Sequence, residues 1–598
     1  MRSRLIMEPT LHRRRYEMKL RLLTPYLASR GWLYTASLLL IAAGNIIQSY
    51  YPHILGEFID RLKNDDIAMP DIRMYALMLV AIAVCYGSMA GLGQYLIMRL
   101  GRGFERLMRK RLFRHFTRLS ESYYAKHGVG QMLSYVMNDV TSVREAISVC
   151  LNQTANAVIL LLSAFVMMAA SGLPWGLIVP CVSPLLLIPF LVVYFGPRIR
   201  KRSRIVQNAL ARMTESAEEQ FGGMRVTQKF AAEDVMAERF GGTVDRIRES
   251  QLGLVRMSSF FQALLPFLGA LSLVVTIAYG GYQALSGAIT IGMFVSLTLY
   301  VRLMINPLQQ IGNVINTMQR SRASLERLQE LLSIIPDISD AEQSVPLSGS
   351  GIELRGLSFN YPGSPMEALH DIQLSVKPGM TAGIIGRTGS GKTTIAKLLL
   401  RIYEAPPRTI RIGETDIREL GLGSLRENIA YVPQDGFLFS TTMRDNIAFS
   451  RRNAEQREVE DASRQAGIYE SIQQFSEGFQ TRLGERGVTL SGGQRQRTSL
   501  ARGLIKDAPI LILDDSVSAV DAVTETAIIR NIQQLRQNKT TLIIAHRISA
   551  LKHADVIFVM DEGRIVQQGT HESLLAEKGI YAELFALQQG GTSHGQIG

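Results

Sequence analysis

The feature that most constrains this chain is a series of six apolar segments confined to its first half. They lie near residues 31–53, 74–98, 152–171, 175–196, 260–283 and 289–312. A helix needs roughly 20 mainly apolar residues to cross a hydrocarbon layer about 30 Å thick, and each segment meets or approaches that length. We therefore expect residues 1–318 to form an all-α domain of six membrane-spanning helices.

The connections between these segments alternate in length, and the long ones follow the second and fourth segments. They cover residues 99–151 and 197–259, contain few helix breakers, and carry apolar residues at helical spacing. Basic clusters lie in or beside them and near the N-terminus, at Arg13–Arg15, Arg109–Arg111 and Arg198–Arg202. Because cytoplasmic connections are enriched in Lys and Arg, we expect paired helices that project from the membrane into the cytoplasm.

The formal net charge of +13 has the same explanation. Its excess lies beside apolar segments, so we expect a lipid bilayer as partner and no nucleic acid. Cys85, Cys150 and Cys181 lie in or near apolar segments without metal-ligand spacing, which argues against a disulfide framework or a zinc site. The first thirty residues lack the apolar core of a signal peptide, so we expect none to be cleaved.

Polar residues inside the apolar segments suggest a second kind of site. Six of them recur at three- or four-residue steps on two helices: Asn45 and Gln48 in the first segment, and Arg302, Asn306, Gln309 and Asn313 in the sixth. They could hydrogen-bond between helices or lie near the membrane surface. Alternatively, they line a substrate cavity in which Arg302 favours an anionic or polar group. Pro307 removes one backbone hydrogen bond and is a candidate kink.

The second half begins after residues 319–350, which lose apolar character and are interpreted as a linker. Residues 351–590 carry glycine-rich motifs, and 591–598 form a short tail. The loop Gly386–Thr393 reads GRTGSGKT and fits the P-loop pattern, with an apolar strand before it and an apolar helix after it. Its backbone N–H groups would hold phosphates, Lys392 would reach the β- and γ-phosphates, and Thr393 would bind Mg²⁺.

Two further motifs in this half support ATP binding. The run Ile510–Asp514 is a short apolar strand closed by a carboxylate, as expected for a buried strand that presents Asp514 to magnesium. Between this strand and the P-loop lies Leu490–Gln494, which reads LSGGQ. We therefore expect an α/β P-loop nucleotide-binding domain that uses ATP and Mg²⁺.

With this pentapeptide the chain resembles the ABC transporter family, whose signature is LSGGQ, and the resemblance covers essentially the whole chain. It implies that Tyr361 stacks on adenine, that Gln434 approaches Mg²⁺ and water, and that His546 contacts the γ-phosphate. It also implies that Ser491, Gly492, Gly493 and Gln494 face ATP bound by the opposite subunit. The remaining expected contacts to bound nucleotide come from Gly386, Thr388, Gly389, Ser390, Gly391, Lys392, Thr393, Thr394 and Asp514.

The resemblance also implies where the two halves communicate. Gly484–Gly487 would lie near the contact with the membrane domain, and Ser518–Asp521 would cross the dimer interface. Residues 122–130 and 215–233 resemble the family's coupling segments, which sit in a groove of the ATP-binding domain; both could also be simple helix turns. By this resemblance the chain is an exporter-type half-transporter of a bacterial inner membrane, with its nucleotide-binding domain in the cytoplasm.

One residue departs from the family pattern. After the Mg²⁺ carboxylate the family usually has a glutamate that polarises the attacking water, whereas this chain has Asp515. The missing methylene withdraws the carboxylate by about 1 Å, and such a displacement can cost on the order of 10²-fold in rate. We therefore expect the site on this chain to bind ATP and hydrolyse it slowly, as in the degenerate subunit of heterodimeric multidrug exporters. The partner would then supply the catalytic glutamate.

The motifs leave other functions open. An importer on the same scaffold, for example for metal chelators, would carry the same ATP-binding motifs, and a subunit that only binds ATP could act as a regulator. A soluble DNA-associated ATPase of the same family is disfavoured by the six apolar segments. Drugs, lipids, peptides and metal chelators all remain candidate substrates.

Overall fold

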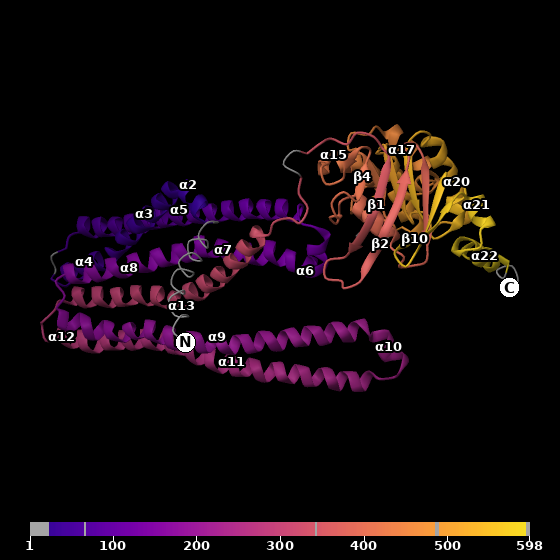
Figure 1. Ribbon diagram of the computed structural model, residues 1–598. Helices are drawn as coiled ribbons and strands as arrows, with labels where there is room; N and C mark the ends of the chain where they lie inside the picture. The colour runs from indigo at the N-terminus through magenta and orange to yellow at the C-terminus, as the bar shows by residue number, and fades with distance from the viewer. Residues whose placement is uncertain (1–22, 65–66, 341–343, 485–489, 594–598) are drawn as a thin grey trace, which may run out of the picture. The chain divides into compact units, whose positions relative to one another are not determined.

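The computed structural model describes residues 23–64, 67–340, 344–484 and 490–593, which form two compact units (Figure 1). The first unit contains the described residues up to Thr117 together with Val129–Ile334. The second contains Arg118–Gly128 and the described residues from Ile335 onward. The short segment 118–128 therefore belongs to the second unit, although residues of the first unit flank it in sequence.

The first unit confirms the six expected spans. The helices long and apolar enough to cross a membrane are Gly31–Lys63, Met69–Phe116, Glu121–Ala170, Trp175–Gly222, Glu233–Leu285 and Ile291–Ser333. Their α-helical parts are α3 (Gly31–Ser49), α4 (Tyr51–Lys63), α5 (Met69–Phe116), α6 (Glu121–Ser134), α7 (Val140–Glu145), α8 (Leu151–Ala170), α9 (Trp175–Gly222), α11 (Glu233–Val275), α12 (Gly281–Leu285) and α13 (Ile291–Ser333). Short π-helical segments at Tyr135–Asp139, Ala146–Cys150 and Thr276–Gly280 interrupt them, and the short helices α2 (Thr24–Ser29) and α10 (Met224–Lys229) complete the unit.

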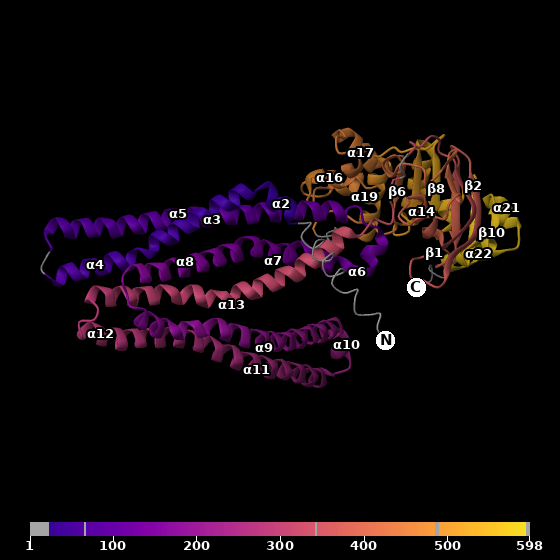
Figure 2. The ribbon, with the colours of Figure 1, turned by 60° about the vertical axis from the view of Figure 1, so that its left-hand side comes forward.

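The long connections are helical, as the sequence predicts. Helices α5 and α9 have 48 residues each. At a rise of 1.5 Å per residue this is about 72 Å, more than twice the thickness of the hydrocarbon layer. In Figures 1 and 2, α9 runs beside α11 along most of its length and α3 runs beside α5, in agreement with their residue contacts.

The linker was expected to begin at residue 319, but the structure places its start later in the chain. Residues 319–333 are the last turns of α13, which ends at Ser333, so the connection to the second unit begins only there. Apolar character is lost where a helix leaves the membrane, but helix formation continues because Arg320–Ser333 contains mostly good helix formers such as Leu, Glu, Gln and Arg. Pro307 lies inside the same helix, which continues on both sides of it.

Helices α4 and α13 approach each other closely through two glycines. A Cβ on Gly292 would lie 2.0 Å from the carbonyl oxygen of Gly56, and a Cβ on Gly56 would lie 1.9 Å from the Ser296 hydroxyl. At the same place Asp60 caps α13, because its Oδ1 accepts from the Gly292 N–H at 2.7 Å. A carboxylate at a helix N-terminus is favoured by the free N–H groups there. Only glycine permits this contact between the first and last spans.

The second unit contains two sheets. A six-stranded sheet has the order β10-β9-β3-β8-β7-β6, and a four-stranded antiparallel sheet has the order β2-β1-β4-β5. The strands are β1 (Ile352–Asn360), β2 (Glu367–Val376), β3 (Thr381–Gly386), β4 (Ile410–Ile412), β5 (Thr415–Asp416), β6 (Ile429–Val432), β7 (Ile510–Asp514), β8 (Thr540–Ile544), β9 (Val556–Asp561) and β10 (Arg564–Gly569). The helices are α14 (Lys392–Leu399), α15 (Leu422–Glu427), α16 (Met443–Ile447), α17 (Gln456–Gln465), α18 (Tyr469–Gln473), α19 (Gly492–Leu504), α20 (Ala522–Leu535), α21 (His571–Ala576) and α22 (Ile580–Ser593).

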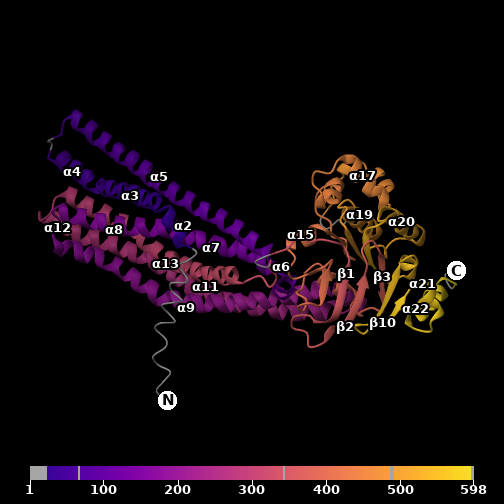
Figure 3. The same ribbon diagram turned by 45° about the horizontal axis from the view of Figure 1, so that its top comes forward.

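The central strands are buried on both faces, which explains why they are continuously apolar. In β7, Ile510 and Ile512 face a core shared with α14 and the four-stranded sheet. Leu511 and Leu513 face the opposite core, which contains residues of α17, α19 and α20. Figure 3 shows α21 and α22 beside β10, at the far edge of the six-stranded sheet. The fold is therefore the expected α-helical membrane unit followed by an α/β unit.

Candidate ATP-binding site

The expected ATP-contacting residues are brought together by the order of the six-stranded sheet. Strands β3, β8, β7 and β6 are adjacent and parallel. Strands β3, β8 and β6 are followed by the P-loop, His546 and Gln434, respectively. Strand β7 ends at Asp514, and Asp515 comes next. Because parallel strands end at the same edge of a sheet, these groups from distant parts of the sequence share one edge. Ligands of open α/β sheets bind at this edge.

The P-loop depends on its glycines. A Cβ on Gly386 would lie 2.1 Å from the carbonyl oxygen of Met560, so β3 and β9 leave no room for a side chain there. Gly389 and Gly391 have φ angles of +84° and +95°, which glycine adopts without strain. Gly391 is also the N-cap of α14, so the loop leads directly into a helix N-terminus. The backbone N–H groups of a glycine-rich loop that leads into a helix N-terminus can donate hydrogen bonds to phosphate oxygens.

The P-loop lysine is held inside its own loop. The Lys392 ammonium donates to the carbonyl oxygens of Gly386 and Arg387 at 2.9 and 2.8 Å, and to the Ser390 hydroxyl at 3.3 Å. Burial lowers the pKa of Lys392, and the charges of Asp515 and Asp514 act in the opposite direction. The lysine is thus a buried cation whose charge could be matched by phosphate.

The chemistry of the groups beside the P-loop fits Mg²⁺. Thr393 Oγ1 donates to Asp514 Oδ1 at 3.0 Å, and the Tyr431 hydroxyl donates to Asp514 Oδ2 at 3.1 Å. Burial raises the pKa of Asp514, an effect that these two hydrogen bonds oppose. A hydroxyl and a carboxylate are the oxygen ligands Mg²⁺ prefers, and the ion usually takes few protein ligands plus substrate phosphates. No cluster of three or more His, Cys, Asp or Glu that could hold a metal occurs among the described residues.

Tyr361 lies next to the helix that follows the P-loop. Its hydroxyl is 2.9 Å from Thr394 Oγ1, and its ring makes edge-to-face contacts with Phe359 and Tyr403 at centroid distances of 5.3 and 5.1 Å. Tyr361 and Thr394, both expected to contact nucleotide, are therefore neighbours. The ring has the half-buried position and fixed orientation that stacking on a base requires.

Asp515 is fixed by backbone and side-chain contacts. Its φ is +48°, a left-handed conformation that Asp tolerates better than most residues. Its N–H donates to the Ile544 carbonyl at 2.8 Å, and its Oδ2 accepts from Gln434 Nε2 at 3.2 Å. The structure thus brings two of the expected catalytic residues into direct contact.

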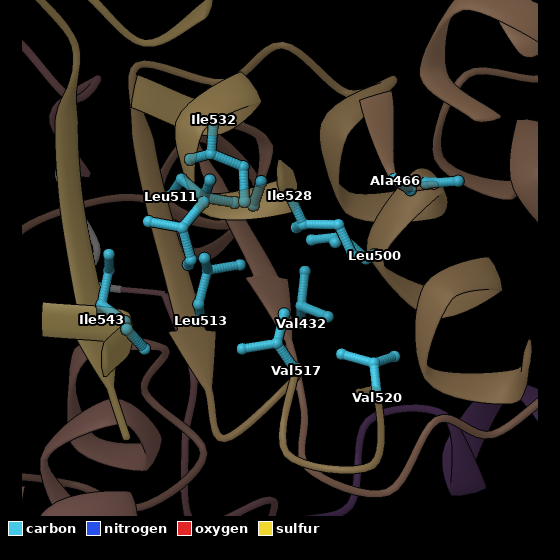
Figure 4. Packing of buried hydrophobic residues seen from close by; sticks show 14 of the residues in the cluster. Val432, Ala466, Leu500, Leu511, Leu513, Val517, Val520, Ile528, Ile532 and Ile543 are labelled. Carbon is cyan, nitrogen blue, oxygen red and sulfur yellow. The ribbon is translucent and has the colours of Figure 1, made fainter. Parts of the chain in front are cut away.

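Gln496, which the sequence motifs did not single out, joins several of these segments. Its Oε1 accepts from the Ala519 N–H at 2.9 Å, and its Nε2 lies 3.3 Å from the Gln434 carbonyl oxygen and 3.5 Å from that of Asp515. Gln496 belongs to α19, which begins with the LSGGQ motif. Figure 4 shows the apolar packing of the same helix, in which Leu500 lies near Val432, Val517 and Val520. Only its position two residues after the motif could have drawn attention to it.

Comparison with known proteins identifies the family. The chain matches the ABC transporter transmembrane region over residues 34–308 and the ABC transporter domain over residues 369–518. It is 35% identical over 560 residues to the probable multidrug resistance ABC transporter ATP-binding/permease protein YheI of Bacillus subtilis, covering 93% of this chain and 96% of that protein. The chain belongs to the ABC transporter family.

Other ABC transporters are similar over most of their length. The chain is 32% identical over 519 residues to the ATP-dependent lipid A-core flippase of Syntrophus aciditrophicus, covering 86% of each protein. It also matches the structure of a bacterial Atm1-family ABC exporter with ATP bound, with a TM-score of 0.76, 25% identity, and coverage of 94% of this chain and 98% of that one. The protein is thus an exporter-type half-transporter: an integral multi-pass membrane protein whose ATPase is coupled to transport.

The ABC signature lies at the start of α19. Ser491 is the N-cap of α19, and Ser491 and Gln494 form a capping box in which each side chain accepts from the other's backbone N–H, at 3.3 and 3.0 Å. Gly492 and Ser491 are exposed, whereas a Cβ on Gly493 would lie 2.9 Å from the Ala519 carbonyl oxygen. The predicted segment Gly484–Gly487 falls outside the described residues after Gly484. An exposed helix N-terminus of this kind can receive an anion from another molecule.

Most of the expected coupling segment 122–130 belongs to the second unit, which contains Arg118–Gly128, whereas residues 129 and 130 belong to the first. In segment 118–128, Glu121 pairs with Lys397 of α14 at 2.9 Å, and the hydroxyls of Ser120 and Ser122 donate to Asp337 Oδ2 at 2.5 and 3.0 Å. Gly128, with φ +68°, provides the kink at which the segment ends. The other expected segment forms the turn around α10 in the first unit, where Phe221 and Phe230 are 74% and 78% exposed.

Two of the six residues expected to line a membrane cavity lie in one pocket. Pockets for small ligands usually have volumes of roughly 300–1,000 Å³, and one of about 400 Å³ lies among α3, α4, α5 and α13. Gln48 and Arg302 both line it, with Tyr51, Tyr86 and aliphatic side chains. Asn45 is fully buried and neither polar atom of its amide has a hydrogen-bond partner among the described residues. Asn306, Gln309 and Asn313 lie further along α13 and do not line the pocket.

Proposed function

We propose that this ABC transporter is one subunit of a heterodimeric exporter, and that its own ATP site holds ATP but hydrolyses it slowly. The observation that carries the proposal is Asp515 at the position of the usual glutamate, with its carboxylate held by Gln434 at 3.2 Å. The side chain is one methylene shorter than glutamate and its carboxylate is held by this hydrogen bond, which supports slow activation of an attacking water. A displacement of about 1 Å is enough to lower a rate on the order of 10²-fold.

The rest of the site supports ATP binding. Lys392 and the P-loop N–H groups would hold the phosphates, and Thr393, Asp514 and Gln434 would hold Mg²⁺, which neutralises charge on the phosphates. Tyr361 would stack on adenine and His546 would contact the γ-phosphate. The exposed capping box of Ser491 and Gln494 supports a role of this signature at the partner's ATP site. This chain would therefore complete hydrolysis at the partner's site while it retains nucleotide at its own.

We propose that the exporter moves an amphiphilic molecule with an anionic or polar group. The pocket between α3 and α13 supports this, because aliphatic side chains share it with Arg302, which forms no ion pair with the part of the chain described here. A charged side chain within a membrane span is costly unless it serves a partner or a watery cavity. The relatives named for multidrug resistance and for lipid A-core flipping fit the same ligand chemistry.

The subunit composition is tested by purifying the full-length chain alone and measuring its ATPase activity and oligomeric state. We expect an activity far below one turnover per second, and recovery when a second half-transporter with a glutamate after its Mg²⁺ aspartate is co-expressed. A homodimer of this chain that hydrolyses ATP at several turnovers per second would contradict the proposal.

The substrate class is tested by transport in liposomes that contain the assembled protein. Fluorescent amphiphiles with the same tail and an anionic, neutral or cationic head are compared in the wild type, Arg302→Gln and Arg302→Lys. We expect Arg302→Gln to reduce transport of the anionic compound selectively, and Arg302→Lys to retain it. An equal loss of transport for the anionic, neutral and cationic compounds would contradict the proposal that Arg302 selects an anionic or polar group.

The main alternatives make distinct predictions in the same liposomes. When ATP is added outside, only transporters whose nucleotide-binding domains face outward are active. An exporter then moves substrate into the liposome, whereas an importer moves it out. A regulatory subunit would bind ATP without driving any substrate movement. The similarity to an Atm1-family ABC exporter and to a multidrug resistance transporter favours the exporter.

A further inference from the structure

The C-terminal helix α22 touches two loops of the ATP site. Gln588 Nε2 donates to the His546 carbonyl oxygen at 2.8 Å, and Gln588 Oε1 accepts from the Ile548 N–H at 3.0 Å. One turn earlier on the same helix, Glu583 lies 3.7 Å from Arg387 of the P-loop. The Glu583 pair is exposed and contributes little energy, but it shows that α22 runs alongside both loops.

Strand pairing fixes only the start of the loop around His546. The N–H of Ala545 is bonded to the Ile384 carbonyl oxygen of β3 at 3.1 Å, after which strand pairing ends. The His546 imidazole makes no hydrogen bond to any residue in the described ranges. Its position is therefore set by the peptide groups on either side of it, and Gln588 binds the one between His546 and Arg547 together with the next, between Arg547 and Ile548.

The side chains that follow His546 are fixed from the opposite direction. Arg547 donates to Glu525 Oε2 at 2.9 Å and to the Val520 carbonyl oxygen at 3.3 Å. Ser549 donates to Glu525 Oε1 at 2.7 Å, and Glu525 is buried. The buried carboxylate thus holds the side chains of the loop, whereas Gln588 holds its backbone.

The start of α22 is held by contacts of Tyr581 with α21 and β10, and these contacts limit the movement of the helix that carries Gln588. Tyr581 is fully buried, and its hydroxyl lies 2.8 Å from Nδ1 of His571. Its N–H donates to Gln567 Oε1 of β10 at 3.1 Å. Two turns later the helix places Gln588 on the same side as Tyr581 and Leu584, because residues three, four and seven apart share a helix face.

We infer that Gln588 is a positioning residue for ATP: its amide binds the peptide groups on both sides of Arg547 and thereby places the His546 imidazole for the γ-phosphate. This rests on the proposed contact of His546 with the γ-phosphate. It gives α22, which carries no ATP-binding motif, a specific part in distinguishing ATP from ADP.

The test uses membranes that contain the full-length chain in the assembly it forms there. Photolabelling with azido-ATP and azido-ADP in the cold, resolved by subunit, gives the affinity of this chain for each nucleotide. The variants are Gln588→Ala, Gln588→Glu, His546→Ala and the double variant Gln588→Ala with His546→Ala. Leu587→Ala, which alters an exposed side chain on the same helix, is the matched control.

We expect Gln588→Ala to weaken azido-ATP binding about three- to tenfold, the effect of one or two lost hydrogen bonds, and to change azido-ADP binding less than about twofold. Gln588→Glu has the same size but replaces the donor with an acceptor, so it should lose at least as much. In the His546→Ala background the Gln588 substitution should add little, because coupled residues are not additive. Leu587→Ala should resemble the wild type.

Four results would overturn the inference. Equal weakening of ATP and ADP binding by Gln588→Ala and Gln588→Glu would indicate a general structural role, and unchanged binding of both would indicate none. A changed ATP-to-ADP ratio in His546→Ala, without one in Gln588→Ala, would overturn the inference alone. An unchanged ratio in His546→Ala would instead overturn the proposed role of His546, and the inference with it.

Discussion

Gln434 donates a hydrogen bond to Asp515 across 3.2 Å, which fastens the residue after the magnesium aspartate to the loop that follows β6. This contact joins the two groups expected to prepare water for attack. Under the proposal above, the Asp515 carboxylate held by this contact lacks the reach of the usual glutamate.

Replacing Asp515 with glutamate restores that reach. We expect Asp515→Glu to raise the steady-state ATPase activity of the assembled transporter several-fold, with a limit near 10²-fold for its own site. Asp515→Asn is the control, since it keeps the length but removes the charge, and it should not increase activity. No increase with glutamate would mean that the partner's signature is also defective.

Removing the Thr393 hydroxyl should weaken the magnesium site. Thr393→Val keeps the shape of the side chain but loses the bond to Asp514 and one oxygen ligand. Loss of a ligand or of the group that orients it typically costs about 10–100-fold in metal affinity. We expect the Mg²⁺ concentration that supports half-maximal ATP binding to rise by that factor, whereas Thr393→Ser should stay close to the wild type.

The pair of Glu121 and Lys397 gives a charge-reversal test of coupling. Both side chains are partly exposed, so breaking the pair should cost the ATP-binding unit no more than about 1 kcal/mol. We expect Glu121→Lys to reduce transport more than ATP binding, because two cations then face each other, and the double exchange with Lys397→Glu to recover transport. Failure of the double exchange to recover would show that the pair does not transmit the signal.

The buried contact between His571 and Tyr581 should make the stability of the ATP-binding unit depend on pH. Burial lowers the pKa of His571 below its usual 6.5, with Glu572 acting against the shift and Lys552 and His553 adding to it. The unfolded chain therefore takes up a proton at a higher pH than the folded one, and stability falls as the pH drops below about 6.5.

His571→Gln is the variant that isolates this contribution, since glutamine does not titrate. We expect the unfolding midpoint of the wild type to fall more steeply between pH 7.5 and 5.5 than that of the variant. Parallel curves would show that other groups account for the pH dependence.

The spans and the ATP-binding strands could be predicted because each follows from a local pattern. A span is defined by a continuous apolar run, and β7 by an apolar run that ends at Asp514, so neighbours in sequence carry the information. The end of α13 could not be predicted in this way. Its apolar run ends where the membrane does, whereas the helix itself continues to Ser333.

The contacts of Gln496 and Gln588 were also beyond prediction. Each glutamine acts on loops from distant parts of the sequence, and a lone glutamine on a helix has no local pattern that indicates such contacts. For Gln48 and Arg302 the opposite holds: helical spacing indicated a polar face, and the fold placed one residue from each helix in a single pocket.

The assignment of residues 118–128 to the second unit limits how genes of this family can recombine. A crossover in the connection after Ser333 would pair the ATP-binding half of one parent with the segment 118–128 of the other. Ser120, Glu121 and Ser122 would then meet foreign counterparts of Asp337 and Lys397. Chimeras that exchange 118–128 together with the C-terminal half should therefore remain active more often than those divided at a single point.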